Sequence, residues 1–402
     1  MLVVYFIILS LCVVATFSFH QTYHCTVGAG RKSAFIIRSL PLLFLSPTKN
    51  GSPDNIHTCV VLYDDGYDGE FLSDAKDVAR TAGIPLFYTS NITQREKFTH
   101  ALKLIPYDYC GEQSTFALSI EPMGNLLEEG SRRSKRRSKK PKKYSSSSAF
   151  FVDLCPIKNS RAGRRVSGAS GTSDLLIKAV SPRKGASSGN GNRDGAIICD
   201  LTAGLGQDSM FLAMNGAHHV HMIERNPIVA ALLQDAMRRL QLISSSSFTG
   251  SSKWSKSQQE HQTQKELACS LLKKLSLTIG EGVDILQKHH HRYDVIYLDP
   301  MFPSRQKQSA VKKGMQILHG LIETKNQSIE VDRRNSLQEE KEQEEQHLLL
   351  SALDTAKLRV VVKRPIKAAL LGCDKIAKPS YSIAGSMNRW DIYVKPKLPS
   401  TL

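Results

Sequence analysis

The chain lacks the cysteine patterns that would indicate a metal site or a disulfide framework. Its eight cysteines are irregularly spaced along 402 residues, and none forms a C-x-x-C pair. We therefore expect mostly reduced thiols and no bound metal. The apolar stretch Leu2–Ala15 has only fourteen residues, fewer than the ~20 that a membrane-spanning helix needs. These absences argue against a disulfide-stabilised secreted domain and against a membrane span.

Acidic residues are too few to balance the basic ones. The chain has 54 lysines and arginines against 37 aspartates and glutamates, which gives a net charge of +17. Such an excess points to a polyanionic partner. Part of the charge is local, because nine of the twelve residues from 132 to 143 are lysine or arginine. This run is typical of a disordered linker, which could add nonspecific affinity for RNA or simply be solvated.

Two short segments, about ninety residues apart, predict a nucleotide-cofactor pocket and a reaction site. The first is D-L-T-A-G-L-G-Q-D at 200–208, which follows the apolar run 196–199 and precedes a second apolar run at 209–214. This order indicates a strand, a glycine turn and a helix. Gly204 and Gly206 lack a Cβ, so a ligand can approach the backbone closely. Alone, such a turn could equally serve only the backbone.

The residues around this turn favour S-adenosylmethionine over a dinucleotide. The next predicted strand ends at Glu224, whose carboxylate could accept hydrogen bonds from ribose hydroxyls or could simply be solvated. The third glycine of a dinucleotide fingerprint is replaced by Ser209. Asp208 would repel a pyrophosphate but suits a zwitterionic methionine group. With Asp200 and Asp299 it makes the predicted pocket acidic, which favours a sulfonium.

The second segment is D-P-M-F-P at 299–303, at the end of the apolar run 293–298. Asp299 and the backbone carbonyl of Pro300 could accept hydrogen bonds from an exocyclic amine. Phe302 could stack on an extruded base, an interaction worth ~1–3 kcal/mol. The alternative is that Asp299 caps a turn and Phe302 packs in the core. Together with the glycine turn, this segment indicates transfer of a methyl group to an amine.

Four runs of the sequence resemble the bacterial ribosomal RNA small-subunit guanine-N2 methyltransferase J family. They are residues 199–233, 295–303, 306–313 and 359–365, and they occur in the family's order. The resemblance covers about half of the chain strongly. It implies a class I methyltransferase that uses S-adenosylmethionine to methylate the exocyclic N2 of a guanosine in 16S-type RNA. Its partner would be small-subunit ribosomal RNA or a ribosomal subunit.

The resemblance also implies roles for single residues. It places Gln207 and Asp208 at the methionine end of the cofactor, and Glu224 and Arg225 at the ribose and adenine edge. Glu281 and Gly282 stand where the family has a serine pair, and Gln207 stands where an arginine is usual. The predicted cofactor-binding residues are Asp200, Gly204, Gly206, Gln207, Asp208, Glu224, Arg225, Glu281, Gly282 and Asp299. The predicted catalytic residues are Asp299, Pro300 and Phe302.

Basic residues near the second segment predict contacts with RNA phosphates. The predicted RNA-binding residues are Lys307, Lys312, Lys313, Lys363 and Arg364. Such side chains would position an RNA substrate without reading its sequence. A solvated basic surface is the alternative interpretation.

The N-terminal segment looks like a targeting leader. The stretch Leu2–Ala15 is typical of a signal-peptide core, and no aspartate or glutamate precedes Asp54, although basic residues do. The combination resembles the two-part plastid leader of algae with complex plastids. A mitochondrial address is the second choice and secretion the third. We expect no stable membrane anchor after removal of the leader.

The predicted fold class is α/β, with a class I methyltransferase Rossmann-like sheet that is mostly parallel. Strands are expected to end at Asp200, Glu224, Gly280, Asp299 and Lys363, and residues 390–394 should add an antiparallel C-terminal edge. The predicted organisation is a leader at 1–54, a small α/β domain at 55–130, a basic linker at 131–149 and the methyltransferase domain at 150–395. Low-complexity insertions are expected near 244–264 and 324–346.

Two other functions remain open from the residues alone. One is an amino-methyltransferase acting on adenine or cytosine of RNA or DNA, because D-P-x-F does not distinguish the base. The other is a noncatalytic RNA-binding ribosome-assembly factor that retains the pocket. The oligomeric state is not predicted.

Overall fold

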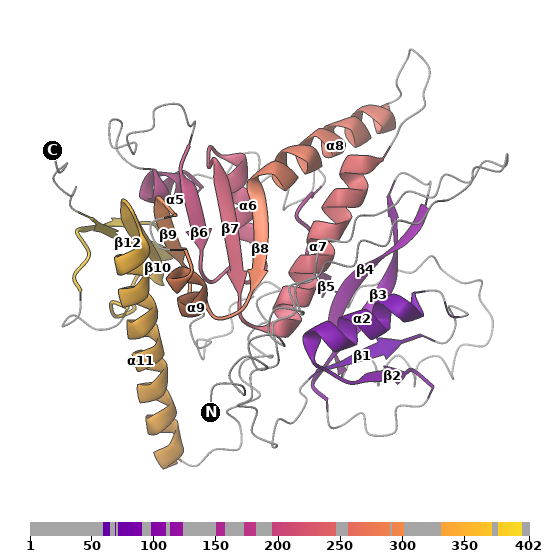
Figure 1. Ribbon diagram of the computed structural model, residues 1–402, viewed down its shortest axis with the longest axis horizontal. Coiled ribbons are helices and arrows are strands. Elements are labelled where there is room, and N and C mark those ends of the chain that lie inside the picture. Colours follow the sequence, from indigo (N-terminus) through magenta and orange to yellow (C-terminus); the bar gives the residue numbers. More distant parts are fainter. Residues whose placement is uncertain are drawn as a thin grey trace, which may run out of the picture. The chain divides into compact units, whose positions relative to one another are not determined.

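A computed structural model of the protein describes residues 59–64, 69, 71–90, 98–109, 113–123, 150–156, 173–181, 195–246, 256–289, 292–300, 331–371 and 377–395. All of them belong to one compact unit, Ile56–Leu402. The predicted leader at 1–54 and the basic linker at 131–149 lie outside the described residues. The described part contains two sheets (Figure 1).

The larger sheet has seven strands in the order β11-β12-β10-β9-β6-β7-β8. The strands are β6 (Ile197–Asp200), β7 (His219–Glu224), β8 (Leu275–Ile279), β9 (Val295–Leu298), β10 (Arg359–Pro365), β11 (Tyr381–Ala384) and β12 (Asn388–Val394). The five strands from β6 to β10 are parallel to one another. The chain first proceeds from β6 through β7 to β8, and then continues at β9 on the other side of β6. The predicted mostly parallel sheet is confirmed.

The antiparallel part of the sheet has two strands where the sequence predicts one. β12 covers the predicted residues 390–394, and it pairs antiparallel with β10 on one side and with β11 on the other. β11 is therefore the outer strand. Its four residues are half-buried or exposed, so they lack the apolar pattern that reveals a strand in a sequence.

Helices cover both faces of the larger sheet. Alternate residues of each central strand point to opposite faces, so each strand packs against helices on both sides. Met222 of β7 and Val361 of β10 pack in a cluster with helices α5, α6, α7 and α8. Ile223 and Val360, one position away, pack with α9 and α11. The helices are α5 (Ser173–Val180), α6 (Gln207–Met214), α7 (Pro227–Ser245), α8 (Lys256–Lys274), α9 (Gly282–Gln287) and α11 (Val331–Thr355). The sheet is thus the middle of three layers.

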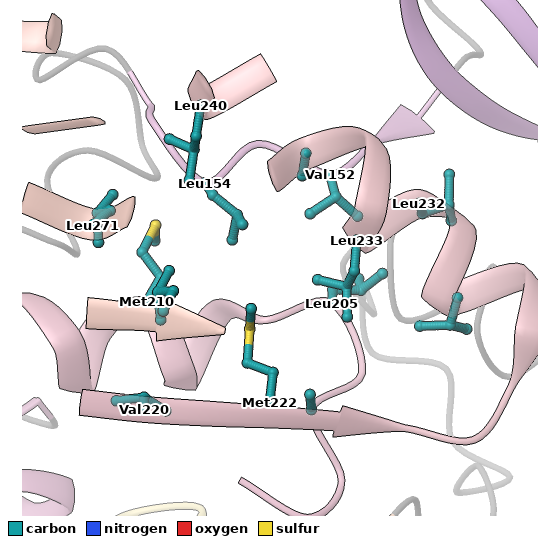
Figure 2. Close-up of a cluster of buried hydrophobic side chains, with 14 of the residues drawn as sticks. Val152, Leu154, Leu205, Met210, Val220, Met222, Leu232, Leu233, Leu240 and Leu271 are labelled. Atoms are coloured by element: carbon teal, nitrogen blue, oxygen red, sulfur yellow. The ribbon is translucent and has the colours of Figure 1, made fainter. Parts of the chain in front are cut away.

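The predicted glycine turn lies on the core between β7 and α7. Figure 2 shows Leu205 of this turn close to Leu233 of α7 and Met222 of β7. Buried side chains therefore pack against one side of the turn, which lies at the carboxyl end of β6.

Helix α7 begins at a side-chain cap. The side chain of Asn226 accepts hydrogen bonds from the backbone N–H groups of Ile228 and Val229, at 3.0 and 3.2 Å. Pro227 follows as the first helical residue, where its missing N–H costs no hydrogen bond. This cap fixes the start of α7 three residues after the end of β7.

The smaller sheet has five strands in the order β2-β1-β3-β4-β5. They are β1 (Cys59–Tyr63), β2 (Leu86–Tyr88), β3 (His100–Tyr109), β4 (Gln113–Pro122) and β5 (Phe150–Phe151), with helix α2 (Leu72–Ala82) between β1 and β2. The sequence places residues 150–151 in the second domain, but they pair with β4. This edge strand therefore belongs to the smaller sheet.

The two predicted insertions are largely helical where the structure describes them. α7 continues to Ser245 and α8 begins at Lys256, so much of 244–264 is helix. Likewise, α11 begins at Val331 and includes most of 324–346. None of the helices in the described ranges is long and apolar enough to cross a membrane.

A buried carboxylate joins α7 to the smaller sheet. Asp235 of α7 accepts hydrogen bonds from the backbone N–H of Leu118 in β4, at 2.9 Å, and from the neighbouring Arg238 and Arg239, at 2.8 and 2.9 Å. The Arg238 guanidinium also lies over the ring of Phe116, 3.9 Å from its centroid. The charge of Asp235 is therefore paired even though the side chain is 4% exposed.

Replacing Asp235 should destabilise the protein strongly. Asp235→Ala removes the partner of two guanidinium groups and of a buried N–H, so we expect the free energy of unfolding to fall by about 3–5 kcal/mol. As a control, Asp77→Ala removes an exposed partner of Arg80 and should change the free energy of unfolding by about 0.5 kcal/mol or less. Urea unfolding measures both. Equal losses in the two variants would contradict this account of Asp235.

Candidate functional site

The site lies where the order of the larger sheet reverses, between β6 and β9. Asp200 ends β6, and Asp299 follows β9. The backbone N–H of Asp299 donates to the hydroxyl of Thr202 at 2.7 Å, which connects the two strand ends. Ligands of open α/β sheets bind at this kind of switch point, outside the carboxyl ends of the strands. The structure thus brings together the two segments that the sequence singles out.

The two glycines of the turn have different roles. Both have positive φ angles, 54° at Gly204 and 68° at Gly206, which other residues rarely adopt. A Cβ at Gly206 would lie 2.9 Å from the side chain of Leu233, so this position requires glycine for packing. At Gly204 the nearest atom would be the carbonyl oxygen of Thr202 at 3.9 Å. Gly204 therefore borders open space, as a ligand-facing position should.

Glu224 is tied to the glycine turn. One of its carboxylate oxygens accepts from the backbone N–H of Gly204 at 2.9 Å, and the other accepts from Asn226 at 2.7 Å. Burial raises the pKa of Glu224, and these two N–H groups oppose that rise. Each carboxylate oxygen has two acceptor positions. The predicted ribose contact is compatible with these bonds, since they need not use every position.

Asp200 is a buried carboxylate beneath the site. It is 2% exposed, and its side chain accepts a short hydrogen bond from the hydroxyl of Ser209 and one from the backbone N–H of Thr202 at 3.3 Å. Burial raises the pKa of Asp200 to about 7, with Asp208 and Asp299 adding to the rise. Its protonation therefore changes near neutral pH.

Lys363, two residues before the end of β10, connects two of the predicted cofactor residues. Its Nζ lies 2.7 Å from Oδ2 of Asp208 and 2.7 Å from Oδ2 of Asp299. The hydroxyl of Tyr297 donates to the same oxygen of Asp208 at 2.8 Å. Burial alone would lower the pKa of Lys363, but Asp299 and Asp208 outweigh it and raise this pKa above its usual range. The lysine is therefore a charged member of the cluster.

Lys363 and Arg364, for which the sequence predicts phosphate contacts, have partners within the protein. Lys363 is only 18% exposed and is bonded to two carboxylates. Arg364 is 6% exposed, donates to the carbonyl of Ala369 at 3.0 Å and lies 3.7 Å from Glu345 of α11. Alternation along β10 brings these two side chains to opposite faces of the sheet, where each finds an acidic partner. Both basic residues are thus internal in the structure.

Two further predicted cofactor residues meet at the edge of the site. Arg225 lies 3.8 Å from Glu281, which precedes α9, and 3.4 Å from Glu344 of α11. All three side chains are more than 60% exposed, so the pairs are weak individually. Gly282 has a packing role, because a Cβ there would lie 2.9 Å from the side chain of Leu201.

The remaining predicted site residues fall into two groups. Gln207 is exposed at the first position of α6, and Pro300 is buried beside Asp299. The other predicted residues lie outside the described part of the chain. They are Phe302, Lys307, Lys312 and Lys313.

Three residues of the site were missed from the sequence. Thr202 and Ser209 lie within or beside the glycine motif, but a hydroxyl there has no distinctive pattern. Tyr297 had a usable signal, because it lies two residues before Asp299 and strand alternation puts both side chains on one face. Burial raises the pKa of Tyr297 well above its usual value, so its hydroxyl remains a hydrogen-bond donor to Asp208.

Comparison with known proteins gives matches over most of the chain. Residues 127–249 and 255–395 match a family model described as "Putative SAM-dependent methyltransferase". A ribosomal RNA small subunit methyltransferase J from Psychromonas ingrahamii is 33% identical over 249 residues, which are 62% of this chain and 77% of that protein. The protein of the same name from Tolumonas auensis is 34% identical over 244 residues, 61% of this chain and 77% of that one.

A solved structure is also similar. It is a SAM-dependent methyltransferase from Neisseria gonorrhoeae, 21% identical, with a TM-score of 0.43. The match covers 84% of this chain and 96% of the other.

The donor groups of the site fit S-adenosylmethionine. Four carboxylates, those of Asp200, Asp208, Glu224 and Asp299, lie around the switch point, and Lys363 is paired with two of them, Asp208 and Asp299. An excess of negative charge attracts a sulfonium. Open space beside Gly204 admits a ligand to the turn, and the acidic residue at the end of β7 suits a ribose.

Ionisation of Asp200 should make the protein less stable as the pH rises. The folded-state pKa of about 7 lies above the ordinary value of 3.8, so the folded protein holds a proton that the unfolded chain releases. The contribution of Asp200 to stability is therefore greatest below pH 3.8 and is lost as the pH rises towards 7. One pKa unit corresponds to about 1.4 kcal/mol, so the wild type should lose roughly 4 kcal/mol relative to Asp200→Asn between pH 4 and 8.

Denaturant unfolding at several pH values measures this difference. The exposed Asp284 of α9 offers a control, since Asp284→Asn should follow the wild-type pH dependence. A constant difference between wild type and Asp200→Asn from pH 4 to pH 8 would show that Asp200 does not titrate in this range.

Proposed function

This chain belongs to the ribosomal RNA small subunit methyltransferase J family of SAM-dependent methyltransferases, and on that premise we propose that it methylates small-subunit ribosomal RNA. The acceptor that the family resemblance favours is the exocyclic N2 of a guanosine. The substrate is the RNA itself or a ribosomal subunit that contains it. The net charge of +17 is consistent with such a polyanionic partner.

The accessibility of Asp299 carries the proposal. Its side chain is 34% exposed, whereas that of Asp208 is 13% exposed and Asp200 is 2% exposed. Its position is nevertheless fixed, by the bond from its N–H to Thr202 and by Lys363. Asp299 therefore combines a fixed carboxylate with access from solvent, and a substrate amine needs both.

Asp299 would act by orienting the amine and taking up charge. The lone pair of an exocyclic amine is delocalised into the ring of guanine, so the amine is a poor nucleophile. A carboxylate that accepts an N–H hydrogen bond holds the nitrogen in place and favours the positive charge that develops on it. Asp299, or water beside it, can then accept the proton that the nitrogen loses. S-Adenosylmethionine, when bound, supplies an electrophilic methyl group.

The remaining site residues would bind and orient. The open space at Gly204 and the carboxylate of Glu224 suit the nucleoside part of the cofactor. Arg225 and Glu281 lie at the outer edge, where the family resemblance places the adenine. Asp208 lies in the first turn of α6, where the resemblance places the methionine group.

Nucleoside mapping tests the reaction and the substrate. Small-subunit ribosomal RNA from plastids and mitochondria, with and without the intact protein, is digested and analysed by mass spectrometry. We expect the loss of a single N2-methylguanosine, in plastid RNA in accordance with the leader-like N-terminus. Loss of a methylated adenine or cytosine instead would show that this base, and not guanine, is the target. Unchanged maps in both organelles would contradict methylation of this RNA.

Asp299→Asn should abolish most of the activity while leaving the fold intact. The amide is nearly isosteric, but it carries no charge and is a weaker hydrogen-bond acceptor. We expect kcat to fall by about 10²–10⁴-fold, measured as transfer of a radioactive methyl group to small-subunit RNA. Asp284→Asn is the matched control and should retain wild-type activity. Full activity of Asp299→Asn would exclude its carboxylate from the reaction.

A further inference from the structure

Lys363 has a place in the site that the proposed reaction leaves unexplained. Its Nζ lies 2.7 Å from a carboxylate oxygen of Asp208 and 2.7 Å from one of Asp299. Since both distances start from the same nitrogen, the two oxygens are at most about 5.4 Å apart. Two carboxylates this close repel each other strongly when a cation does not lie between them.

The two carboxylates belong to different parts of the chain and have different tasks. Asp208 is at the start of α6 and is assigned to the cofactor. Asp299 follows β9 and is assigned to the amine that receives the methyl group. Lys363 comes from a third element, β10. Its ammonium group therefore connects the cofactor side of the site to the acceptor side.

We propose that Lys363 is a positioning residue, which holds the carboxylates of Asp208 and Asp299 in fixed relative orientation and keeps both ionised. This inference rests on the proposed function, because it assigns Asp299 to the acceptor amine. Methyl transfer requires the acceptor nitrogen, the methyl carbon and the leaving sulfur to be in line, and a small misplacement can cost about 10²-fold in rate. A single ammonium bonded to both carboxylates limits such misplacement.

The structure favours this role over a contact with RNA phosphate. The side chain of Lys363 is 18% exposed, and two bonds of its ammonium point to carboxylates inside the site. Tyr297 supports the same arrangement, since its hydroxyl donates to the oxygen of Asp208 that also binds Lys363. The nearby carboxylates keep the lysine charged despite its burial. A lysine held in this way has little capacity to neutralise a phosphate.

Stability measurements on the ligand-free protein test the proposal without the reaction. Lys363→Met keeps most of the length of the side chain and removes its charge. At pH 8 both carboxylates are ionised and repel, so the melting temperature should fall well below that of the wild type. At pH 5 a proton can enter the pair, and the difference should be smaller. An equal loss at both values would show that Lys363 only packs.

Two more variants separate charge from packing if Lys363→Met folds poorly. Lys363→Arg retains the cation and should recover most of the lost stability. Adding Asp208→Asn to Lys363→Met removes one of the two repelling charges and should also restore stability at pH 8. Lys178→Met, at an exposed position of α5, is the control and should match the wild type. Failure of both restorations would overturn the electrostatic role.

Kinetics then distinguish positioning from RNA binding. For Lys363→Met we expect kcat to fall about 100-fold, with KM for RNA and its salt dependence unchanged. The acid limb of the pH–rate profile should move to higher pH, because the carboxylates lose the cation that favours their ionised form. Lys363→Arg should restore part of kcat. A higher KM for RNA with a shallower salt dependence and unchanged kcat would assign Lys363 to phosphate binding instead.

The outcomes also separate this inference from the proposed function. If the wild type transfers no methyl group to small-subunit RNA, the proposed function fails, whereas the pH-dependent stability of Lys363→Met still tests the link between the carboxylates. If the wild type is active and Lys363→Met keeps its full kcat and an unchanged pH profile, the function stands and the role of Lys363 is wrong.

Discussion

The site depends on the tight placement of the glycine turn against the hydrophobic core. Gly206 has a positive φ angle that other residues rarely adopt, and a Cβ there would lie 2.9 Å from the side chain of Leu233. Because the turn packs closely against the core, the N–H of Gly204 is held where it donates a hydrogen bond to the carboxylate of Glu224. The same constraint starts α6 at the point where Asp208 reaches Lys363. Packing beneath the turn therefore determines the geometry of the polar groups above it.

The carboxylates of the site differ because their surroundings differ. Asp200 is buried and bonded to Ser209, and burial raises its pKa to about 7, so it gains a proton near neutral pH. Glu224 accepts hydrogen bonds from two backbone N–H groups, so it holds the glycine turn and can also bind a ligand. Asp208 and Asp299 share a lysine. Similar side chains thus have three different roles. Asp200 is a buried group of the core, Glu224 holds the glycine turn, and Asp208 and Asp299 bind the same lysine.

Much of the fold and of the cofactor side of the site could be predicted from the sequence. The glycine turn, the acidic strand end at Glu224 and the cap at Asn226 are local patterns, and local patterns predict local structure. β11 could not be predicted, because its short exposed sequence has no apolar alternation. Neither could the inward position of Lys363, since a basic residue at a strand end looks the same whether its partner is a phosphate or an aspartate 64 residues away. Contacts between distant elements require the tertiary structure.

Helix α7 contacts both sheets. Its capped end lies beside Glu224 at the cofactor pocket, and Asp235, nine residues along, holds β4 of the smaller sheet. At 1.5 Å per residue these two anchor points are about 13 Å apart on a single rigid rod. A disturbance that frays this helix loosens both anchors together. In hydrogen exchange, the amides of α7 and β4 should therefore open as one cooperative unit, and a ligand at the pocket should slow exchange in a sheet that it does not touch.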